Sequence, residues 1–429
     1  MDTIFALSSG ALPSGVAIIR LSGPQAFATL ESLTGKSFAP RVARLSALKD
    51  DQDQMLDEAL CLAFKAPHSF TGEDVVELHC HGGRATVDAV LAHLVSLPNH
   101  RMAEAGEFSR RAFLNDRMDL TAMEGLSDLI AAQTDGQRRL ALSQAGGALR
   151  DQYEAWRSVL VRSRAMIEAE FDFSDEDGIP GAVSERIWAD VRGLKQEIET
   201  HLDVGKQGEI VRDGFRVVLM GPPNAGKSSL LNALAKREVA IVTDVPGTTR
   251  DVLEVSLDMG GQLVIVSDTA GLRDTDDVVE LEGIRRACKK ALEANLIFFL
   301  VPVNENLPDN IPEDAIVGRS KSDLLGTIGV GNSVSVKSEG GLSFVLDQIE
   351  RSISKFSNSN DAVMMSRYRH RQELNTCSAA LSESLESALP LELRSEALRQ
   401  AGDALGRLTG RIDVEHLLDV IFSEFCVGK

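Results

Sequence analysis

The fold is decided by an octapeptide near the middle of the chain, Gly221-Pro222-Pro223-Asn224-Ala225-Gly226-Lys227-Ser228. It follows an apolar, β-prone run at 215–220 and precedes a segment with helical spacing at 229–234. The two glycines let backbone N–H groups turn inward around a phosphate, and the following helix directs its positive end to the same place. Lys227 adds a positive charge and Ser228 a hydroxyl for Mg²⁺. The octapeptide therefore predicts a phosphate-binding loop within an α/β domain.

Two motifs downstream of this loop indicate a GTPase. Asp268-Thr269-Ala270-Gly271 follows an apolar strand expected at 263–266. An acid at that position can hold a metal through water, and the glycine N–H can reach a γ-phosphate. Gly247-Thr248-Thr249-Arg250-Asp251 lies between the loop and this motif. Taken alone it would be an ordinary polar loop, but in this context it predicts a second γ-phosphate sensor.

The segment that selects the base departs from the usual GTPase pattern. The common Asn-Lys-x-Asp occurs here as Ser320-Lys321-Ser322-Asp323, and Ser335-Val336-Lys337 is a weaker candidate for the last base-contacting loop. Asp323 can accept two hydrogen bonds from guanine, which disfavours an ATP-using enzyme. A serine cannot reach as far as an asparagine amide, so a reduced nucleotide affinity is expected.

Outside the phosphate loop, the residue composition and the hydrophobic pattern change several times along the chain. Residues 1–117 mix short apolar runs with Gly, Pro and Ser, which indicates an α+β segment. A capping-box spacing of Thr121 and Glu124 predicts the start of a long helical stretch. Helical stretches are expected at about 121–171, 184–204 and 364–425, with a linker at 205–208.

The region between these helical stretches alternates strands with helices, which predicts a mostly parallel sheet. Beyond 215–220, strands are expected at 253–257, 263–266, 296–301 and 315–317, a hairpin turn at 258–261 and a helix at 281–294. The connection at 302–312 is short and proline-rich, so the sheet is expected to be reduced at that edge. An α/β module between helices suggests an insertion into one helical domain, and two independent bundles would give the same pattern.

Composition narrows the class of protein. The chain has 429 residues, which suggests two to four domains, and it is 43% hydrophobic and 25% charged, as expected for a globular protein. The 45 basic and 64 acidic residues give a net charge of −19. Because phosphate affinity comes largely from Lys and Arg, a broad nucleic-acid-binding surface is disfavoured. Any RNA contact should be local or shared with a partner.

The cysteines and the chain start indicate a soluble, cytoplasmic protein. The five cysteines have no paired spacing, which disfavours a disulfide framework or a zinc module, and the first residues lack the pattern of a signal peptide. The most apolar run, 296–303, is too short to cross a membrane. Cys426 is either a nucleophile in an accessible tail or a packed or redox-exposed cysteine.

Further motifs lie outside the α/β region. They are Asp2-Thr3-Ile4, the segments 18–23, 69–79, 81–83 and 106–115, and the C-terminal Phe425-Cys426-Val427-Gly428-Lys429. With these motifs and the GTPase loops, the chain resembles the tRNA-modification GTPase family MnmE, also called TrmE, over nearly its whole length.

The resemblance implies a multidomain α/β and α fold. It comprises an N-terminal α+β tetrahydrofolate-binding and dimerisation domain at 1–117, a helical domain at 118–210 and 357–429, and an inserted Ras-like P-loop GTPase domain at 211–356. The family acts as a homodimer with the FAD protein MnmG, in a heterotetramer, to add a carboxymethylaminomethyl or aminomethyl group at C5 of the wobble uridine of certain tRNAs. The competing hypothesis is a GTPase switch in RNP or ribosome assembly without modification chemistry.

The resemblance also implies the residues of a K⁺-stimulated GTPase site. Those implied to contact GTP are Asn224, Ala225, Gly226, Lys227, Ser228, Ser229, Thr243, Thr248, Thr249, Asp268, Thr269, Ala270, Gly271, Ser320, Lys321, Asp323, Ser335, Val336 and Lys337. Ser228 and Thr249 would hold Mg²⁺, whereas Asn224, Thr243, Val245 and Thr248 would hold K⁺. The catalytic residues would be Glu280, Lys227 and Thr249, with Glu280 orienting the attacking water. On the residues alone, Glu280 could instead stabilise a helix N-terminus.

The implied folate site consists of Arg20, Glu77, Arg117 and Lys429. Its ligand would be 5-formyl- or 5,10-methylene-tetrahydrofolate. A pterin offers an amide and amino edge to a carboxylate, and glutamyl carboxylates suit Arg or Lys. Arg117 stands where relatives commonly have a Lys, and each of these residues could otherwise belong to a surface ion pair.

Overall fold

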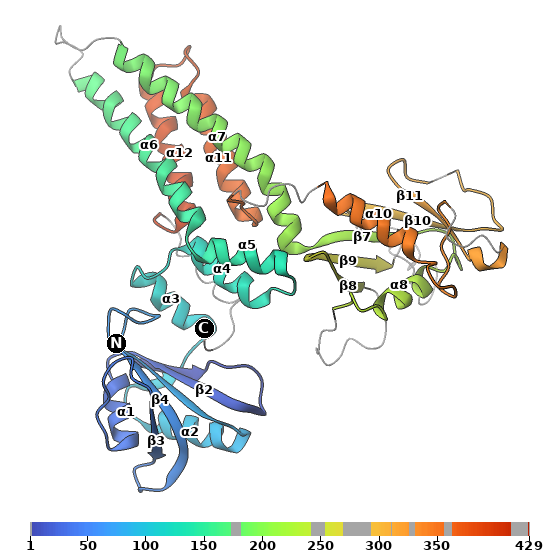
Figure 1. The fold of residues 1–429 in the computed structure, drawn as a ribbon. Coiled ribbons are helices and arrows are strands. Elements are labelled where there is room, and N and C mark those ends of the chain that lie inside the picture. The colour runs from blue at the N-terminus through green and yellow to red at the C-terminus, as the bar shows by residue number, and fades with distance from the viewer. Residues whose placement is uncertain are drawn as a thin grey trace, which may run out of the picture. The chain divides into compact units, whose positions relative to one another are not determined.

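The computed structural model describes residues 2–172, 182–241, 254–268, 293–309, 311–325, 331–355, 363–412 and 428. The chain divides into two compact units, which are considered separately (Figure 1). The first unit contains residues up to Ser127, Arg150–Arg157 and the described residues from Gly402 onward. The second contains Asp128–Leu149 and Ser158–Ala401.

The first unit is built on a six-stranded, mostly antiparallel sheet with the order β3-β4-β5-β2-β1-β6. Its strands are β1 Thr3–Leu7, β2 Ser14–Ser22, β3 Arg44–Lys49, β4 Met55–Phe64, β5 Val75–Gly82 and β6 His100–Met102. Its first helices are α1 Ala26–Thr34, α2 Arg84–Ser96 and α3 Glu107–Leu114. The α+β prediction for the N-terminal segment is confirmed.

The two faces of this sheet have different roles because successive strand side chains point to opposite faces. One face packs against α1 and α2 in a core that includes Ile19, Leu21 and Leu78. Arg20 and Glu77 alternate with these residues and therefore lie on the other face. That second face carries a smaller apolar cluster, which includes Ile4 of β1 and Phe108 of α3. The polar pair is thus held at the edge of a packed core.

The helical stretch expected at 121–171 is three helices: α4 Leu120–Ala131, α5 Asp135–Ala145 and α6 Ala148–Asp172. The predicted capping box at Thr121 and Glu124 is wrong. Asp119 caps α4 instead, since its Oδ1 accepts hydrogen bonds from the backbone N–H groups of Thr121, at 2.8 Å, and of Ala122, at 3.2 Å. A short carboxylate just before the first turn reaches these donors, whereas Thr121 already lies inside the helix.

The linker expected at 205–208 is also wrong. Helix α7 runs without interruption from Ala182 to Asp213. Both glycines in this stretch are packing sites, because an added Cβ would overlap Met365 at Gly205 and the Met365 carbonyl oxygen at Gly208. Because these two residues have no side chain, the segment around Met365 can pack closely against α7.

The insertion is confirmed by helices from the two sides of the α/β region that pack on each other. Helix α11, Tyr368–Ser384, lies along α7, and α12, Leu391–Thr409, follows it (Figure 1). The facing residues recur at helical spacing: Trp188, Val191, Leu194 and Ile198 on α7, and Leu374, Cys377 and Leu381 on α11. The Arg394 guanidinium of α12 stacks 3.6 Å from the Trp188 ring centroid.

The inserted domain has a five-stranded sheet in the order β11-β10-β7-β9-β8. Its elements are β7 Phe215–Met220, α8 Lys227–Ala235, β8 Glu254–Met259, β9 Gln262–Asp268, β10 Leu296–Pro302, β11 Ile316–Ser320, the 3₁₀ turn Ser322–Leu325 and α10 Ser343–Ser354. All neighbours are parallel except β8 and β9, which form the predicted hairpin. The expected strands are confirmed. Of the helix expected at 281–294, residues 281–292 lie outside the described residues, and residues 293 and 294 are not helical.

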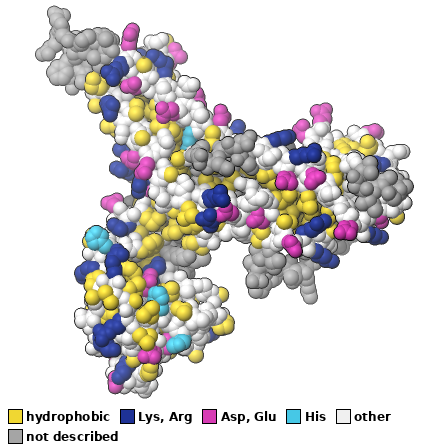
Figure 2. Space-filling view, in the orientation of Figure 1, with side chains coloured by type: hydrophobic (Ala, Val, Ile, Leu, Met, Phe, Trp, Pro, Cys, Tyr) yellow, Lys and Arg dark blue, Asp and Glu magenta, His cyan; other side chains and the backbone are white. Residues whose placement is uncertain are grey.

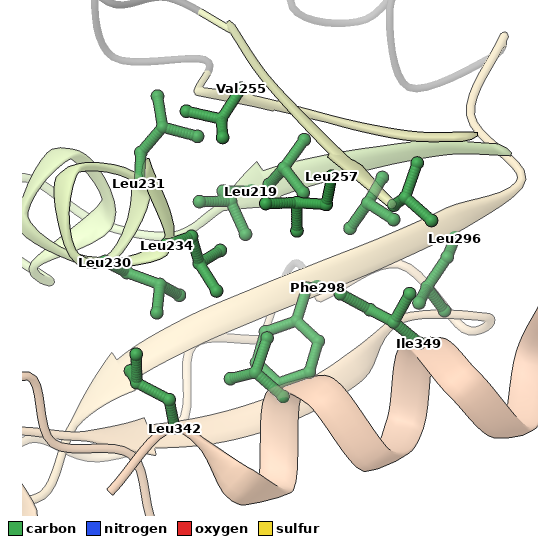
Figure 3. Packing of buried hydrophobic residues seen from close by; sticks show 14 of the residues in the cluster. Leu219, Leu230, Leu231, Leu234, Val255, Leu257, Leu296, Phe298, Leu342 and Ile349 are labelled. Carbon is green, nitrogen blue, oxygen red and sulfur yellow. The ribbon is translucent and has the colours of Figure 1, made fainter. Parts of the chain in front are cut away.

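Helices pack on this sheet through one apolar cluster. Leu230 and Leu234 of α8 and Ile349 of α10 point toward strand residues such as Leu219 and Phe298 (Figure 3). Strand β11 pairs with β10 despite the short connection between them, and beyond β11 the described residues add only an isolated bridge from Arg319 to Ser333. The core holds the strand ends that carry the predicted nucleotide motifs.

Surface charge is mixed on the visible face. Lys and Arg side chains are interspersed with Asp and Glu (Figure 2). Among the helices of the described ranges, none combines the length and apolar character required to cross a lipid bilayer.

Candidate functional site

The phosphate loop has the backbone that its sequence predicts. It joins the end of β7 to the start of α8, and Gly221, Asn224 and Gly226 have φ of 138°, 60° and 95°. An added Cβ at Gly221 would overlap the Leu300 carbonyl oxygen of β10, so only glycine fits there. The loop therefore curls tightly against the sheet and opens at the N-terminus of α8.

Lys227 lies across this loop. Its side chain is buried, and Nζ donates to the carbonyl oxygens of Gly221, at 2.9 Å, and Pro222, at 3.0 Å. These two acceptors hold the ammonium at the loop that would surround a phosphate. A phosphate oxygen could replace a carbonyl as the acceptor with little movement of the side chain.

Ser228 and Asp268 meet at the metal end of the loop. Strand β9 is the parallel neighbour of β7, and Leu219 is paired with Asp268, which places the carboxylate beside the first turn of α8. Ser228 Oγ donates to Asp268 Oδ2 at 2.5 Å, and Asp268 is 3% exposed. A hydroxyl and a carboxylate are hard oxygen donors of the kind that Mg²⁺ prefers, so these residues fit that ion.

The base-selecting segment is joined to the phosphate loop by Ser320. Its Oγ, at the end of β11, donates to the Ala225 carbonyl oxygen at 2.6 Å, and both residues are buried. Lys321 is exposed with φ of 59°. The serine that stands in place of the usual asparagine therefore keeps the two loops connected, which the sequence did not indicate.

The structure brings Asp323 together with the second base-loop candidate. Ser335 Oγ donates to Asp323 Oδ1 at 3.0 Å and accepts the Lys337 backbone N–H at 3.3 Å. Val336 is 43% exposed. These contacts hold the Asp323 carboxylate at one edge of the loop.

The remaining predicted nucleotide residues divide into two groups. Asn224 and Ser229 are exposed at the loop and at the first turn of α8. Outside the described residues lie Thr243, Val245, Thr248, Thr249, Thr269, Ala270, Gly271 and Glu280.

A second polar site lies on the face of the N-terminal sheet that α1 and α2 leave uncovered. Arg20 of β2 is the cross-strand neighbour of Glu77 of β5, and its Nε and Nη2 donate to Glu77 Oε1 at 3.0 and 2.9 Å. The two side chains are 20% and 16% exposed. Nε2 of His79 lies 3.4 Å from Glu77 Oε2.

Two aromatic rings lie near the Arg20 guanidinium and were not predicted. The Arg20 guanidinium carbon lies 5.4 Å from the Phe70 ring centroid and 5.8 Å from that of Phe108. Rings at this distance attract a guanidinium and offer flat apolar surface to a planar ligand. The signal for Phe70 was its place in the 69–79 motif, but only the fold shows that it reaches Arg20.

The loop that carries Phe70 also contacts Arg117. An added Cβ at Gly72 would lie 3.1 Å from Arg117 Cγ, and Gly72 has φ of 79°. The segment 69–74 therefore touches two of the predicted folate residues, Arg20 through Phe70 and Arg117 through Gly72. Lys429 lies outside the described residues, and its neighbour Gly428 accepts a hydrogen bond at its carbonyl oxygen from Ser8 Oγ at 2.7 Å.

Other residues of the N-terminal motifs hold this loop in place. Arg111 donates to Asp2 Oδ1 at 2.8 Å and to Glu73 Oε2 at 3.1 Å. Glu73 Oε2 also accepts from Ser22 Oγ at 2.7 Å, and Ser22 Oγ lies 2.7 Å from Thr71 Oγ1. The motif residues outside the polar pair therefore form a scaffold that positions segment 69–74.

Comparison with known proteins gives the same domain order. A family model described as "GTP-binding protein TrmE N-terminus" matches residues 3–117, and one described as "MnmE helical domain" matches residues 120–426. The chain belongs to the MnmE family. Residues 120–426, which match the helical-domain model, enclose the five-stranded sheet, as expected for a domain inserted between helices.

Curated MnmE relatives match from end to end. "tRNA modification GTPase MnmE" of Rhizobium meliloti (strain 1021) is 50% identical over 444 residues, covering 100% of this chain and 99% of the relative. The protein of the same name from Chelativorans sp. (strain BNC1) is 48% identical over 434 residues, covering 100% and 98%. Among solved structures, the FeoB G-domain from Methanococcus jannaschii is 20% identical, covers 33% of this chain and 98% of that chain, and has a TM-score of 0.25.

The described cysteines of this MnmE-family chain are buried thiols. Burial raises the pKa of Cys61 to about 11 and those of Cys80 and Cys377 to about 12. Because the thiolate is the reactive form, none of the three is suited to nucleophilic chemistry near neutral pH. Cys288 and Cys426 lie outside the described residues.

Proposed function

We propose that this protein is a GTP-hydrolysing tRNA-modification enzyme that acts with the FAD protein MnmG. It would add a carboxymethylaminomethyl or aminomethyl group at C5 of the wobble uridine, position 34, of certain tRNAs. The observation that carries this proposal is end-to-end identity of about half to relatives named "tRNA modification GTPase MnmE". The phosphate loop and the Arg20–Glu77 pair support it, because one chain holds both a nucleotide site and a separate polar site.

In the nucleotide site, Lys227 exchanges its carbonyl acceptors for phosphate oxygens, and Asp323 accepts hydrogen bonds from guanine. Ser228 and Thr249 would hold Mg²⁺, and Asn224, Thr243, Val245 and Thr248 would hold K⁺. When bound, the two ions supply positive charge next to the phosphate oxygens. Glu280 orients the attacking water through its carboxylate. Support comes from the Ser228–Asp268 contact, which gathers oxygen donors beside the loop.

In the N-terminal site, Arg20, Glu77, Arg117 and Lys429 bind a 5-formyl- or 5,10-methylene-tetrahydrofolate. Glu77 receives the amino and amide edge of the pterin, while the cationic residues receive carboxylates. The proposal is supported by a carboxylate that is mostly buried yet keeps one oxygen outside the Arg20 contact. The nearby Phe70 and Phe108 rings would cover a flat heterocycle.

The assembly and the division of the chain are part of the same proposal. The chain forms a homodimer through residues 1–117, pairs with MnmG in a heterotetramer and acts on tRNA in the cytoplasm. The GTPase domain comprises 211–356, and the helical domain comprises 118–210 and 357–429. The nucleotide cycle then drives the conformational change, while the folate and the partner's flavin supply the C5 chemistry.

The experiment is nucleoside analysis of tRNA from a strain in which the gene is deleted. The deletion strain is compared with the same strain complemented by the wild-type chain or by Lys227→Ala. The wild-type chain should restore the C5 group on wobble uridine, and Lys227→Ala should not. A wobble uridine that keeps its C5 group in the deletion strain would refute the proposal. Loss of ribosomal subunits with normal wobble uridine, and no binding of 5-formyl-tetrahydrofolate at millimolar concentration, would favour the assembly switch.

A further inference from the structure

A cavity of about 830 Å³ opens in the first unit beyond Arg117. This volume is within the usual range of small-ligand sites. Residues that follow α3, the first turns of α6 and the end of α12 form its wall. Four arginines line it: Arg117, Arg150, Arg157 and Arg411. We call it the arginine cavity.

Within the described part of the chain, two of these arginines have no acidic partner. Among the described residues, neither Arg117 nor Arg157 forms an ion pair. Arg150 pairs with the exposed Asp151 at 3.0 Å and lies 3.9 Å from Asp119. Arg411 pairs with Glu154 at 2.7 Å. The wall therefore offers guanidinium N–H groups to a ligand in the cavity.

Two of the three acidic residues that line the cavity, Asp119 and Glu154, are held by contacts within the protein. Asp119 is 12% exposed, and its Oδ1 caps α4. Its Oδ2 is buried from solvent without a hydrogen-bond partner. Glu154 is held by Arg411 and by Thr409 Oγ, at 3.4 Å. Asp116 is the one exposed acid among the residues that line the cavity. The cavity accordingly favours an anion over a cation.

The shape of the positive groups favours carboxylates arranged along a chain. A guanidinium presents a planar fork that matches a carboxylate with two parallel hydrogen bonds. Folate coenzymes can carry a tail of γ-linked glutamates, and each added residue contributes one carboxylate. Arg117 belongs both to the proposed folate site and to the cavity wall. A tail that leaves the folate at Arg117 would therefore enter a cavity that Arg150 and Arg157 also line.

We propose that the arginine cavity binds the γ-linked glutamyl tail of the folate coenzyme, which makes polyglutamylated folate the preferred form. This inference rests on the proposed folate site at Arg20, Glu77 and Arg117. It adds Arg150, Arg157 and Arg411 as tail-binding residues. The pterin end remains at the Arg20–Glu77 pair, which does not line the cavity.

The test is equilibrium binding by the full-length protein of 5-formyl-tetrahydrofolate that carries either one or three glutamates. The triglutamate should bind about tenfold tighter than the monoglutamate, as expected if the added carboxylates form charge-assisted hydrogen bonds. Arg157→Gln and Arg150→Gln should each remove most of this difference and leave the monoglutamate affinity unchanged. Arg162→Gln is the matched control, since Arg162 is exposed on the same helix and does not line the cavity.

A second measurement uses the triglutamate tail alone, γ-linked and without pterin, as a competitor of the triglutamate coenzyme. The proposal is supported if the tail competes with the coenzyme for the wild-type protein but not for Arg157→Gln. Equal affinities of the wild type for the two folates overturn it, and monoglutamate binding would then leave the proposed function intact. Failure to bind either folate overturns both. A loss of tRNA affinity in the two variants with an unchanged preference for the triglutamate assigns the cavity to RNA and overturns the tail.

Discussion

Replacing Ser320 by alanine should weaken GTP binding indirectly. Ser320 is not part of the phosphate loop, but its side chain supports that loop through Ala225. The hydroxyl donates to the Ala225 carbonyl oxygen at 2.6 Å, and the two residues are 4% and 0% exposed. Without that donor the carbonyl is left buried, at a cost of about 1–3 kcal/mol. We expect the cost to fall mainly on the complex, because a loop without nucleotide is free to rearrange and expose the carbonyl to water, whereas a loop wrapped around a phosphate is not.

Expressed as affinity, a cost of about 1–2 kcal/mol in the complex raises the Kd for GTP about 5- to 30-fold. The assay is an equilibrium titration with a fluorescent GTP analogue in the presence of Mg²⁺ and K⁺. Ser354→Ala is the matched control, because Ser354 is exposed at the end of α10 and belongs to none of the predicted nucleotide segments. A Kd for Ser320→Ala within twofold of the wild-type value, or the same increase in Ser354→Ala, would refute the reasoning.

The other predictions concern the two sites and the helical core. Lys227→Ala should abolish GTP binding because it removes the buried ammonium at the loop; unchanged affinity in the same titration would contradict the assignment of the phosphate site. Arg20→Gln should weaken 5-formyl-tetrahydrofolate binding about tenfold by releasing Glu77, with GTP hydrolysis unchanged; equal folate affinity would return the pair to a structural role. Burial, with a smaller contribution from His370, lowers the pKa of His201 to about 4. Because the unfolded chain takes up this proton near pH 6.5, stability should fall by up to about 3 kcal/mol as the pH falls from 6.5 to 4. His201→Gln should flatten this dependence in urea unfolding at several pH values, and an unaltered slope would show that other groups cause it.

The parts of the fold that local sequence determines were predicted well. The phosphate loop, its flanking strand and helix, and the β8–β9 hairpin follow from glycine positions and from apolar runs a few residues long. These features depend on backbone freedom and on neighbours in the chain, which a sequence displays directly.

The errors came where a contact that the sequence pattern does not show decides the role of a residue. Gly205 and Gly208 predicted a linker, yet they lie within α7. Glycine is required at these positions because Met365 packs where a side chain would otherwise stand. Thr121 had the spacing of a cap, but Asp119 was closer to the free N–H groups. In both cases the local signal was real and a tertiary contact or a better donor-acceptor geometry decided the outcome.

The candidate sites show the same division. The types and spacing of Lys227, Ser228 and Asp268 predicted a shared phosphate and metal site because strand ends of a parallel sheet meet at one edge. For Arg20, Glu77 and Arg117 the motif resemblance supplied the names. It did not supply the cross-strand ion pair, the Phe70 and Phe108 rings or the arginine cavity, each of which joins residues from separate segments.

By itself, the sequence determined that the octapeptide forms a phosphate-binding loop, the order of strands and helices around it, and the full-length similarity to a GTPase family. Only the tertiary structure decided that Ser320 holds Ala225, that Arg20 lies against Glu77 near two aromatic rings, and that four arginines surround one cavity. The physical reason is range. Backbone conformation and apolar periodicity are set over a few neighbouring residues, whereas hydrogen bonds and ion pairs between side chains depend on which distant segments the folded core brings within about 3 Å of one another.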